Sequence, residues 1–244
     1  MPKQKNTATS LSALKKELNR HANPDKAVVL RRFFKTAKGE YGEGDRFMGV
    51  VVPDIRRVAK RFHTLDLDSV LSLLRSPTHE ERLCALLIMV DDHAKGDSLT
   101  REKIYRAYLA NTRFINNWDL VDLTAPQIVG QHLADKPRDV LYRLAGSKLL
   151  WDRRIAVLAC FWFIRQSDCT DILELTKKLM ADRHDLIHKS LGWMLREVGK
   201  RCSEKTLTTF LDEHAPDMPR TMLRYSIERL DEKKRRHYLA LPRR

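Results

Sequence analysis

The segment 117–122 reads Asn-Trp-Asp-Leu-Val-Asp and joins an aromatic side chain to carboxylates at a helical spacing. Trp118 and Asp122 are four residues apart, so in a helix they lie on one face. Asn117 is a suitable N-cap, and acidic residues near it favour the positive end of the helix dipole. An indole beside a carboxylate could stabilise a cation next to a polyanion. Alternatively, Trp118 packs in the core and the aspartates only complement the dipole.

A second candidate face lies in the segment 185–201, where Lys189, Trp193, Arg196 and Lys200 follow one another at three- and four-residue steps. Basic side chains around one indole are typical of a phosphate-facing surface with a stacking group. A core tryptophan with a basic rim would give the same pattern. Gly192 lowers helix propensity, which indicates the close approach of another group, for example another helix.

Two further patterns could carry chemistry. Arg153 and Arg154 could form a phosphate clamp or only surface salt bridges. His184 and His188 have a metal-binding spacing but lack an internal glutamate and an evident third ligand, so we expect no metal site. The sequence contains no nucleophile elbow, P-loop or dinucleotide motif, and we therefore expect no cofactor.

The composition favours a nucleic-acid partner. The 244 residues carry a formal net charge of +14, with 43% hydrophobic and 32% charged residues. This balance fits a globular protein that binds an anion, and nucleic acid is the first candidate. An acidic membrane surface is the second candidate. The alternative is a basic surface that is only solvated. The four cysteines form no C-x-x-C pair, and no apolar run is long enough to span a bilayer. From the polar start of the sequence we expect no signal peptide. We expect reduced thiols and a cytoplasmic protein, nucleoid-associated if bacterial.

Apolar residues recur with a helical period along the chain. Ser10 and Asn23-Pro24 can start the first two helices, residues 39–49 form the clearest loop, and Thr78-His79-Glu80-Glu81 is a predicted capping box. Later helices are expected at about 53–62, 67–74, 79–92, 99–110, 118–130, 137–146, 149–165, 169–181, 185–201, 204–214, 219–230 and 232–240.

The spacing of these helices predicts the architecture. A helix pair about every 40 residues is typical of HEAT or armadillo repeats. We predict an all-α fold, a right-handed solenoid of HEAT-like antiparallel helix pairs with a concave basic face. A single domain over 10–244 would follow a polar arm at 1–9. An irregular helical bundle is the alternative.

Three segments together resemble the DNA alkylation repair family, the AlkD-like DNA glycosylases. They are 118–122 (Trp-Asp-Leu-Val-Asp), 151–156 (Trp-Asp-Arg-Arg-Ile-Ala) and 192–197 (Gly-Trp-Met-Leu-Arg-Glu). The segments 22–26 and 47–50, with Pro53, also match the opening of the family. The resemblance extends from about residue 11 to residue 240.

This resemblance implies a helical-repeat protein that grips duplex DNA and excises N3- or N7-alkylated purines while the damaged base stays stacked. Asp122 matches the catalytic aspartate, Trp118 and Trp193 match the aromatics that line the deoxyribose, and Arg154 matches an arginine near the backbone. Lys189 and Arg196 are expected to hold phosphates. Phe33 stands where characterised members have tyrosine, so a hydroxyl contact to DNA is lost there.

The expected partner is therefore alkylated double-stranded DNA, bound by a monomer without membrane or small-molecule cofactor. Chemistry supports the expectation, since an alkylated purine is already cationic and needs no general acid to leave. A carboxylate would stabilise the oxocarbenium-like sugar. Two alternatives remain open: a non-catalytic helical-repeat protein that binds branched or structured DNA, and a HEAT scaffold for acidic protein partners.

Overall fold

The computed structural model describes residues 10–242, and every regular element in this range is helical. The predicted all-α class is confirmed. The chain divides into two compact units, Met1–Leu120 and Val121–Arg244, which are described separately below. The predicted arm at 1–9 lies outside the described residues, and the single domain over 10–244 stays a prediction.

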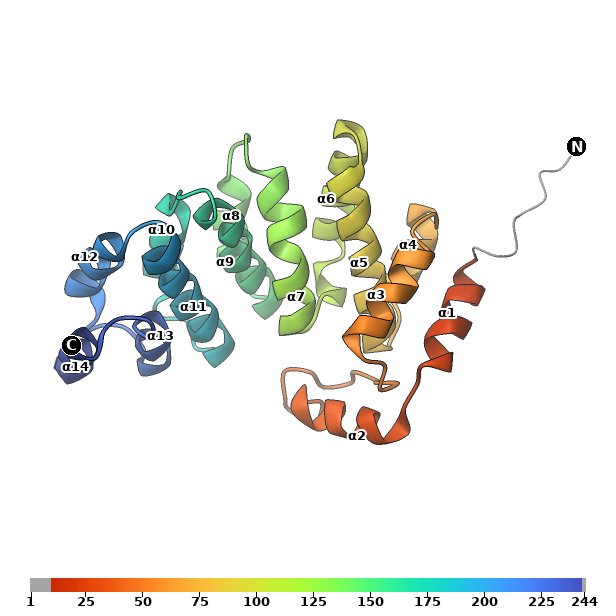
Figure 1. Cartoon of the computed structure of the whole chain (residues 1–244), viewed down its shortest axis with the longest axis horizontal. Coiled ribbons are helices and arrows are strands. Elements are labelled where there is room, and N and C mark those ends of the chain that lie inside the picture. Colours follow the sequence, from red (N-terminus) through yellow and green to blue (C-terminus); the bar gives the residue numbers. More distant parts are fainter. Residues whose placement is uncertain (1–9, 243–244) are drawn as a thin grey trace, which may run out of the picture. The chain divides into compact units, whose positions relative to one another are not determined.

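The first unit is built around one buried helix, α5. Leu83 and the six residues after it are all buried, and α5 packs against α3, α4 and α6 (Figure 1). Its helices and turns are α1 (Leu11–Arg20), α2 (Pro24–Phe33), α3 (Val52–Arg61), α4 (Leu67–Leu74), α5 (His79–Lys95), α6 (Ser98–Ala110), the 3-10 turn Thr112–Phe114 and the start of α7 (Trp118–Ala125).

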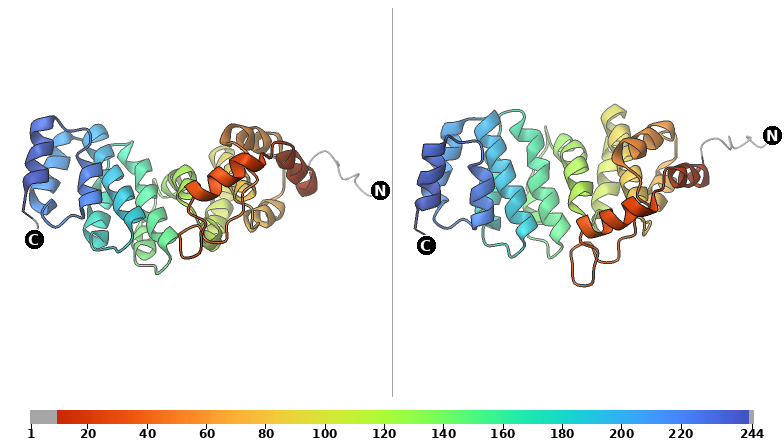
Figure 2. Two further views of the ribbon diagram at one scale, coloured as in Figure 1. Left: turned by 90° about the horizontal axis from the view of Figure 1, so that it is seen from below. Right: turned by 60° about the horizontal axis from the view of Figure 1, so that its bottom comes forward.

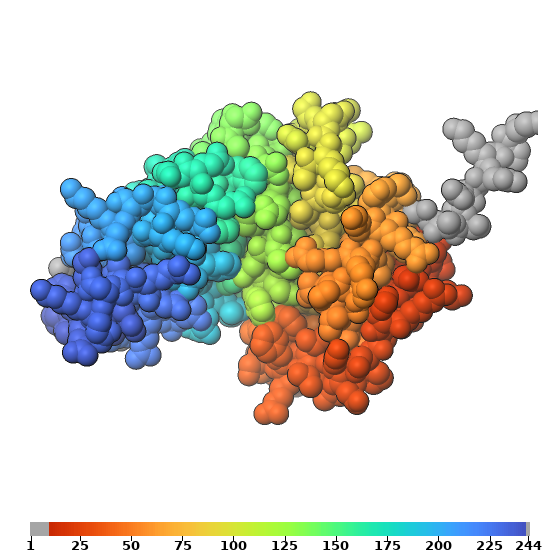
Figure 3. Space-filling model, in the orientation of Figure 1, coloured from red at the N-terminus to blue at the C-terminus, as the bar shows by residue number. Residues whose placement is uncertain are grey.

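Helix α2 runs across the other helices of this unit instead of alongside them (Figures 1 and 2). The predicted start is confirmed, because the Asn23 side chain accepts a hydrogen bond from the Lys26 N–H and Pro24 is the first helical residue. Gly49 has a φ of +83°, and a Cβ there would lie 2.0 Å from the Asn23 carbonyl oxygen. The loop after α2 therefore passes tightly against it, and both form a surface lobe (Figure 3).

The predicted capping box at the start of α5 is wrong. The Thr78 side chain makes no capping hydrogen bond, and the Glu81 carboxylate pairs with Lys15 at 2.9 Å. Glu80 instead accepts hydrogen bonds from the backbone N–H groups of Met48, Gly49 and Val50. Residues 47–50 form no regular element, so their buried N–H groups need other acceptors, and this tertiary demand overrides the local motif.

The second unit is centred on α9 and α11, which pack against each other. The predicted helix at 118–130 is α7 followed directly by a π-helical turn, Pro126–Gly130, which packs on α9. A Cβ at Gly130 would lie 2.4 Å from the Ala159 carbonyl oxygen, so the approach to α9 is close. The other helices are α8 (Asp139–Ala145), α9 (Leu150–Ile164), α10 (Thr170–Leu179), α11 (Asp185–Arg201), α12 (Glu204–His214), α13 (Arg220–Ser226) and α14 (Glu232–Ala240).

Across residues 10–242, no helix is both long and apolar enough to cross a bilayer. All four cysteines are free; Cys84 and Cys160 are buried, whereas Cys169 and Cys202 are half-buried. Burial raises the pKa of Cys84 to about 12, which makes this thiol unreactive.

Candidate functional site

In the first unit, Trp118 closes an aromatic cluster at the start of α7. Its indole stacks on Phe34 at a centroid distance of 5.3 Å and meets Phe33 edge-on at 5.8 Å. Phe34 in turn stacks on Phe47 at 5.2 Å, and the indole packs against this buried core while remaining partly exposed. Trp118 therefore packs partly in the core, as the alternative interpretation of the sequence predicted, but part of its indole remains accessible.

Beneath this cluster lies a buried histidine between two carboxylates. His79 Nε2 is 2.8 Å from Asp119 Oδ2, and His79 Nδ1 is 3.3 Å from Asp45 Oδ2. Asp45 also pairs with Arg82 at 2.7 Å and accepts a hydrogen bond from Asn116 at 3.0 Å. The phenyl rings of Phe34 and Phe47 lie 4.9 and 4.5 Å from the imidazole.

The charges decide the protonation of this histidine. Burial by itself lowers the pKa of His79, but the Asp119 carboxylate and hydrogen bonds to Asp119 and Asp45 outweigh burial and the nearby Arg82. The net pKa of His79 is raised. Burial also opposes ionisation of Asp45, yet His79 and Arg82 lower its pKa. The group thus favours an imidazolium between two carboxylates, fixed to the first turn of α7.

In the second unit, Asp122 and Arg154 form a two-pronged ion pair. Arg154 Nε donates to Asp122 Oδ1 at 2.8 Å, and Nη2 donates to Oδ2 at 2.7 Å. The third donor, Nη1, reaches the Leu186 carbonyl oxygen on α11 at 2.5 Å. Arg154 is 5% exposed, and the Asp122 side chain 14%. A fork of this kind fixes the plane of the carboxylate.

The predicted basic face of α11 is largely engaged by acidic partners. Lys189 pairs with Asp185 at 2.7 Å, and Arg196 pairs with Glu228. Trp193 is half-buried and lies 6.1 Å from the ring of Phe161. These pairs are partly exposed, so each contributes about 0–1 kcal/mol and can open toward an anion.

Gly192 has the expected role as a point of close approach. A Cβ at this position would lie 2.4 Å from the Met222 carbonyl oxygen and 2.6 Å from Tyr225 Cβ. The neighbour is therefore another helix, α13, which packs against α11.

The two histidines of the metal-like spacing have structural contacts instead. His184 Nδ1 accepts from the Leu186 N–H at 3.2 Å, and His188 Nε2 lies 2.5 Å from the Asp182 carbonyl oxygen. In the part of the chain that the structure describes, no group of three or more His, Cys, Asp or Glu side chains could hold a metal ion.

Sequence reasoning missed the role of His79, Asp45 and Glu80. His79 and Glu80 fell inside the supposed capping box, and Asp45 lay in the glycine-rich loop. Asp45 and Asp119 are 34 and 40 residues from His79, so no local spacing links the three. The only signal in the sequence was the position of His79 and Glu80 at the start of a strongly apolar helix. This position does not identify the residues with which they pair.

Comparisons with known proteins show which protein family this all-helical chain is similar to. The family model for the DNA alkylation repair enzyme matches residues 14–230. A solved structure titled as a predicted DNA alkylation repair enzyme from Enterococcus faecalis superposes with a TM-score of 0.67 at 15% identity, covering 87% of this chain and 98% of that one. No curated protein is matched.

The chain belongs to the DNA alkylation repair enzyme family, because the family model covers most of its length. Family membership implies an interaction with DNA. The similar solved structure supports the fold.

Proposed function

We propose that this protein is a DNA glycosylase that excises cationic N3- or N7-alkylated purines from duplex DNA. The observation that carries the proposal is the fork from Arg154 to Asp122, which holds one ionised carboxylate in a fixed orientation. Family membership supports the substrate class. A preorganised carboxylate suits a reaction in which positive charge develops on the sugar.

The proposed step is cleavage of the N-glycosidic bond. The bonding electrons leave with the cationic purine, which becomes neutral, and the sugar becomes oxocarbenium-like. In this step the Asp122 carboxylate, oriented by the two hydrogen bonds from Arg154, would stabilise the sugar cation and orient the attacking water. The water adds to the anomeric carbon and gives up one proton to bulk solvent, which leaves a neutral hydroxyl on the sugar. No general acid is needed, because the leaving group departs neutral.

The remaining predicted residues have supporting roles in this proposal. Trp118, one turn before Asp122 on α7, and Trp193 on α11 would line the deoxyribose and add cation–π attraction of about 0.5–2 kcal/mol each. Arg154 would act mainly by orienting Asp122, near the DNA backbone. Lys189 and Arg196 would exchange their carboxylate partners for phosphates, and Phe33, 59% exposed, would contact the duplex.

The same proposal includes the predicted architecture and setting. The helix pairs would form a right-handed HEAT-like solenoid whose concave basic face binds the duplex as a monomer, in the cytoplasm. The net charge of +14 supports this, since phosphate contacts release counterions.

The test is base release from a duplex that contains one N7-methylguanine. Wild-type protein in excess should release the base well above the spontaneous rate, and Asp122→Asn should lower that rate by about 100-fold or more. Duplex affinity, measured by fluorescence anisotropy, should stay unchanged. Asp139→Asn is a matched control, because Asp139 is an exposed carboxylate in the first turn of α8.

Two outcomes would favour a function other than the proposed glycosylase activity. Tight duplex binding without base release above the spontaneous rate favours a non-catalytic DNA binder. Duplex affinity that hardly depends on salt argues against phosphate contacts and favours a scaffold for acidic proteins.

A further inference from the structure

Exposed apolar side chains gather on one surface of the first unit. Of the seven large hydrophobic residues that are exposed within residues 10–242, five lie on α2 and at the start of α3. They are Val28, Val29, Phe33, Val51 and Val52. Contiguous exposed apolar surface of this kind marks contact sites for other molecules. The cluster is therefore a candidate interaction surface.

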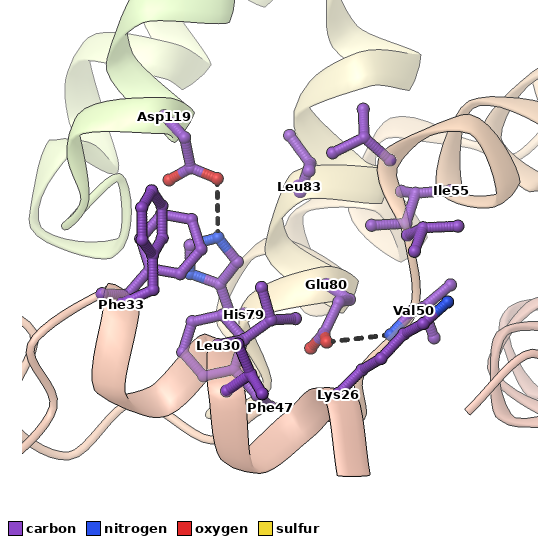
Figure 4. Close-up of a pocket in the computed structure, with 14 residues that line it drawn as sticks. Lys26, Leu30, Phe33, Phe47, Val50, Ile55, His79, Glu80, Leu83 and Asp119 are labelled. Carbon is purple, nitrogen blue, oxygen red and sulfur yellow. Dashed lines mark hydrogen bonds and ion pairs between the residues drawn. The ribbon is translucent and has the colours of Figure 1, made fainter. Parts of the chain in front are cut away.

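A cavity opens among these residues, between α2, the loop before α3, α3 and α5 (Figure 4). Its volume is about 340 Å³, near the lower end of the roughly 300–1,000 Å³ range of ligand sites. Leu30, Phe47, Ile55 and Leu83 contribute to its apolar walls, and Val29, Phe33, Val51 and Val52 join it to the exposed cluster. A cavity of this size and shape can receive one large side chain.

The chemistry of the walls selects an apolar occupant. Both ring nitrogens of His79 are engaged by Asp45 and Asp119. The Glu80 carboxylate is engaged by backbone N–H groups of the 48–50 loop. A nucleobase in the cavity would bury polar edges that find no hydrogen-bond partners there. A hydrocarbon or phenyl group has no hydrogen bonds to lose on burial. Stacked duplex DNA presents no projecting apolar group apart from the thymine methyl, which lies inside the major groove.

The surroundings of the cavity are cationic. Lys26 lines it, and Arg31, Arg32 and Lys35 lie nearby in sequence; all four are exposed. Among the described residues, none of these four side chains forms an ion pair. The cations are therefore available to the flanks of a bound segment, and they complement an acidic one.

We propose that this cavity is a docking site for an acidic segment of a partner protein, which inserts one aromatic side chain between α2 and α3. The inference goes beyond the proposed glycosylase activity and does not depend on it. An aromatic anchor in a pocket surrounded by charge-complementary contacts is the usual form of such recognition.

The test uses a short fluorescent peptide of aspartate and glutamate with one central phenylalanine, and a matched peptide with alanine in its place. Wild-type protein should bind the phenylalanine peptide about tenfold more tightly than the alanine peptide. Val29→Glu, which places a carboxylate at the cavity, should remove this preference. Val28→Glu is the matched control, because Val28 is an exposed neighbour on α2 that does not line the cavity.

Val52→Glu is a second variant, in case Val29→Glu disturbs α2. Val52 also lines the cavity, and an acidic side chain suits the first turn of α3. Equal affinity for the two peptides would overturn the proposal, as would equal effects of Val28→Glu and Val29→Glu. A loss of duplex affinity in Val29→Glu but not in Val28→Glu would also overturn it, since the duplex contact proposed for Phe33 would then extend into the cavity.

Discussion

The imidazole Nε2 of His79 lies 2.8 Å from Oδ2 of Asp119, in the first turn of α7. Asp119 follows Trp118 and precedes Asp122 by three residues, so this bond ties α5 to the helix that carries Trp118 and Asp122. On its other edge the ring faces Asp45. The placement of Trp118 thus depends on a buried charge network.

Removal of the imidazole should destabilise the protein strongly. In His79→Gln the carboxylates of Asp45 and Asp119 lose the cation between them, although both are almost buried. An uncompensated buried charge costs about 3–5 kcal/mol, and relaxation brings our expectation to about 3 kcal/mol. Urea denaturation near pH 6 measures the change in the free energy of unfolding.

His63→Gln is the control for this variant. His63 is an exposed residue of the first unit, and a change there should stay within about 0.5 kcal/mol. A similar loss of stability in both variants would contradict the importance of the network.

The stabilisation from His79 should depend on pH in a defined direction. The pKa of His79 is raised in the folded protein, so its contribution is complete below the unfolded value of about 6.5 and declines as pH rises through the folded pKa. The pKa of Asp45 is lowered, so its contribution is lost only as pH falls through that lowered value. Between these limits the network should stabilise the fold most.

Denaturation of wild type and His79→Gln across pH measures this effect. The difference in their unfolding free energy should shrink as the solution becomes alkaline. A difference that grew with pH would show that His79 is neutral in the folded protein.

Replacement of Arg154 by lysine should slow base release while the charge is kept. Lysine cannot reproduce the two parallel hydrogen bonds to Asp122 or reach the Leu186 carbonyl oxygen at the same time. We expect a fall of about tenfold in the single-turnover rate and a smaller change in duplex affinity.

Arg153→Lys provides the comparison on the same helix. The Arg153 guanidinium is bonded to Asp182 and to the Ser147 carbonyl oxygen, away from the Asp122 carboxylate. Its replacement should change the base-release rate by less than about threefold. Equal loss of rate in both variants would assign the effect to general loosening of α9.

A methyl group at Gly192 should disturb the packing of α11 on α13. The added Cβ would lie 2.4 Å from the Met222 carbonyl oxygen, which is backbone and cannot move away alone. We expect Gly192→Ala to lower the free energy of unfolding by about 1–3 kcal/mol. In Gly146→Ala the nearest atom is 3.5 Å away, so its stability should be almost unchanged. Thermal denaturation of the two variants would separate these outcomes.

Much of the secondary structure could be predicted from the sequence, because local forces determine it. The start of α2 at Pro24 follows from the Asn23 cap, and the start of α12 follows from Ser203, whose side chain accepts from the Thr206 N–H. Ile155 and Leu158 of α9 are three residues apart, as the helical period of buried apolar residues requires, and both are fully buried. The residues that give such signals lie within one or two helical turns of each other. They can therefore be recognised in the sequence without knowledge of the tertiary structure.

Tertiary structure decided how the candidate side chains are used. Arg154 was expected to contact DNA, but 32 residues separate it from the Asp122 carboxylate that its guanidinium now orients. His79 and Glu80 belonged to a plausible local motif, yet they bond to Asp119 and to the 48–50 loop. Charged and polar groups that become buried must find partners wherever the fold brings them, and this long-range pairing leaves no periodic trace in the sequence.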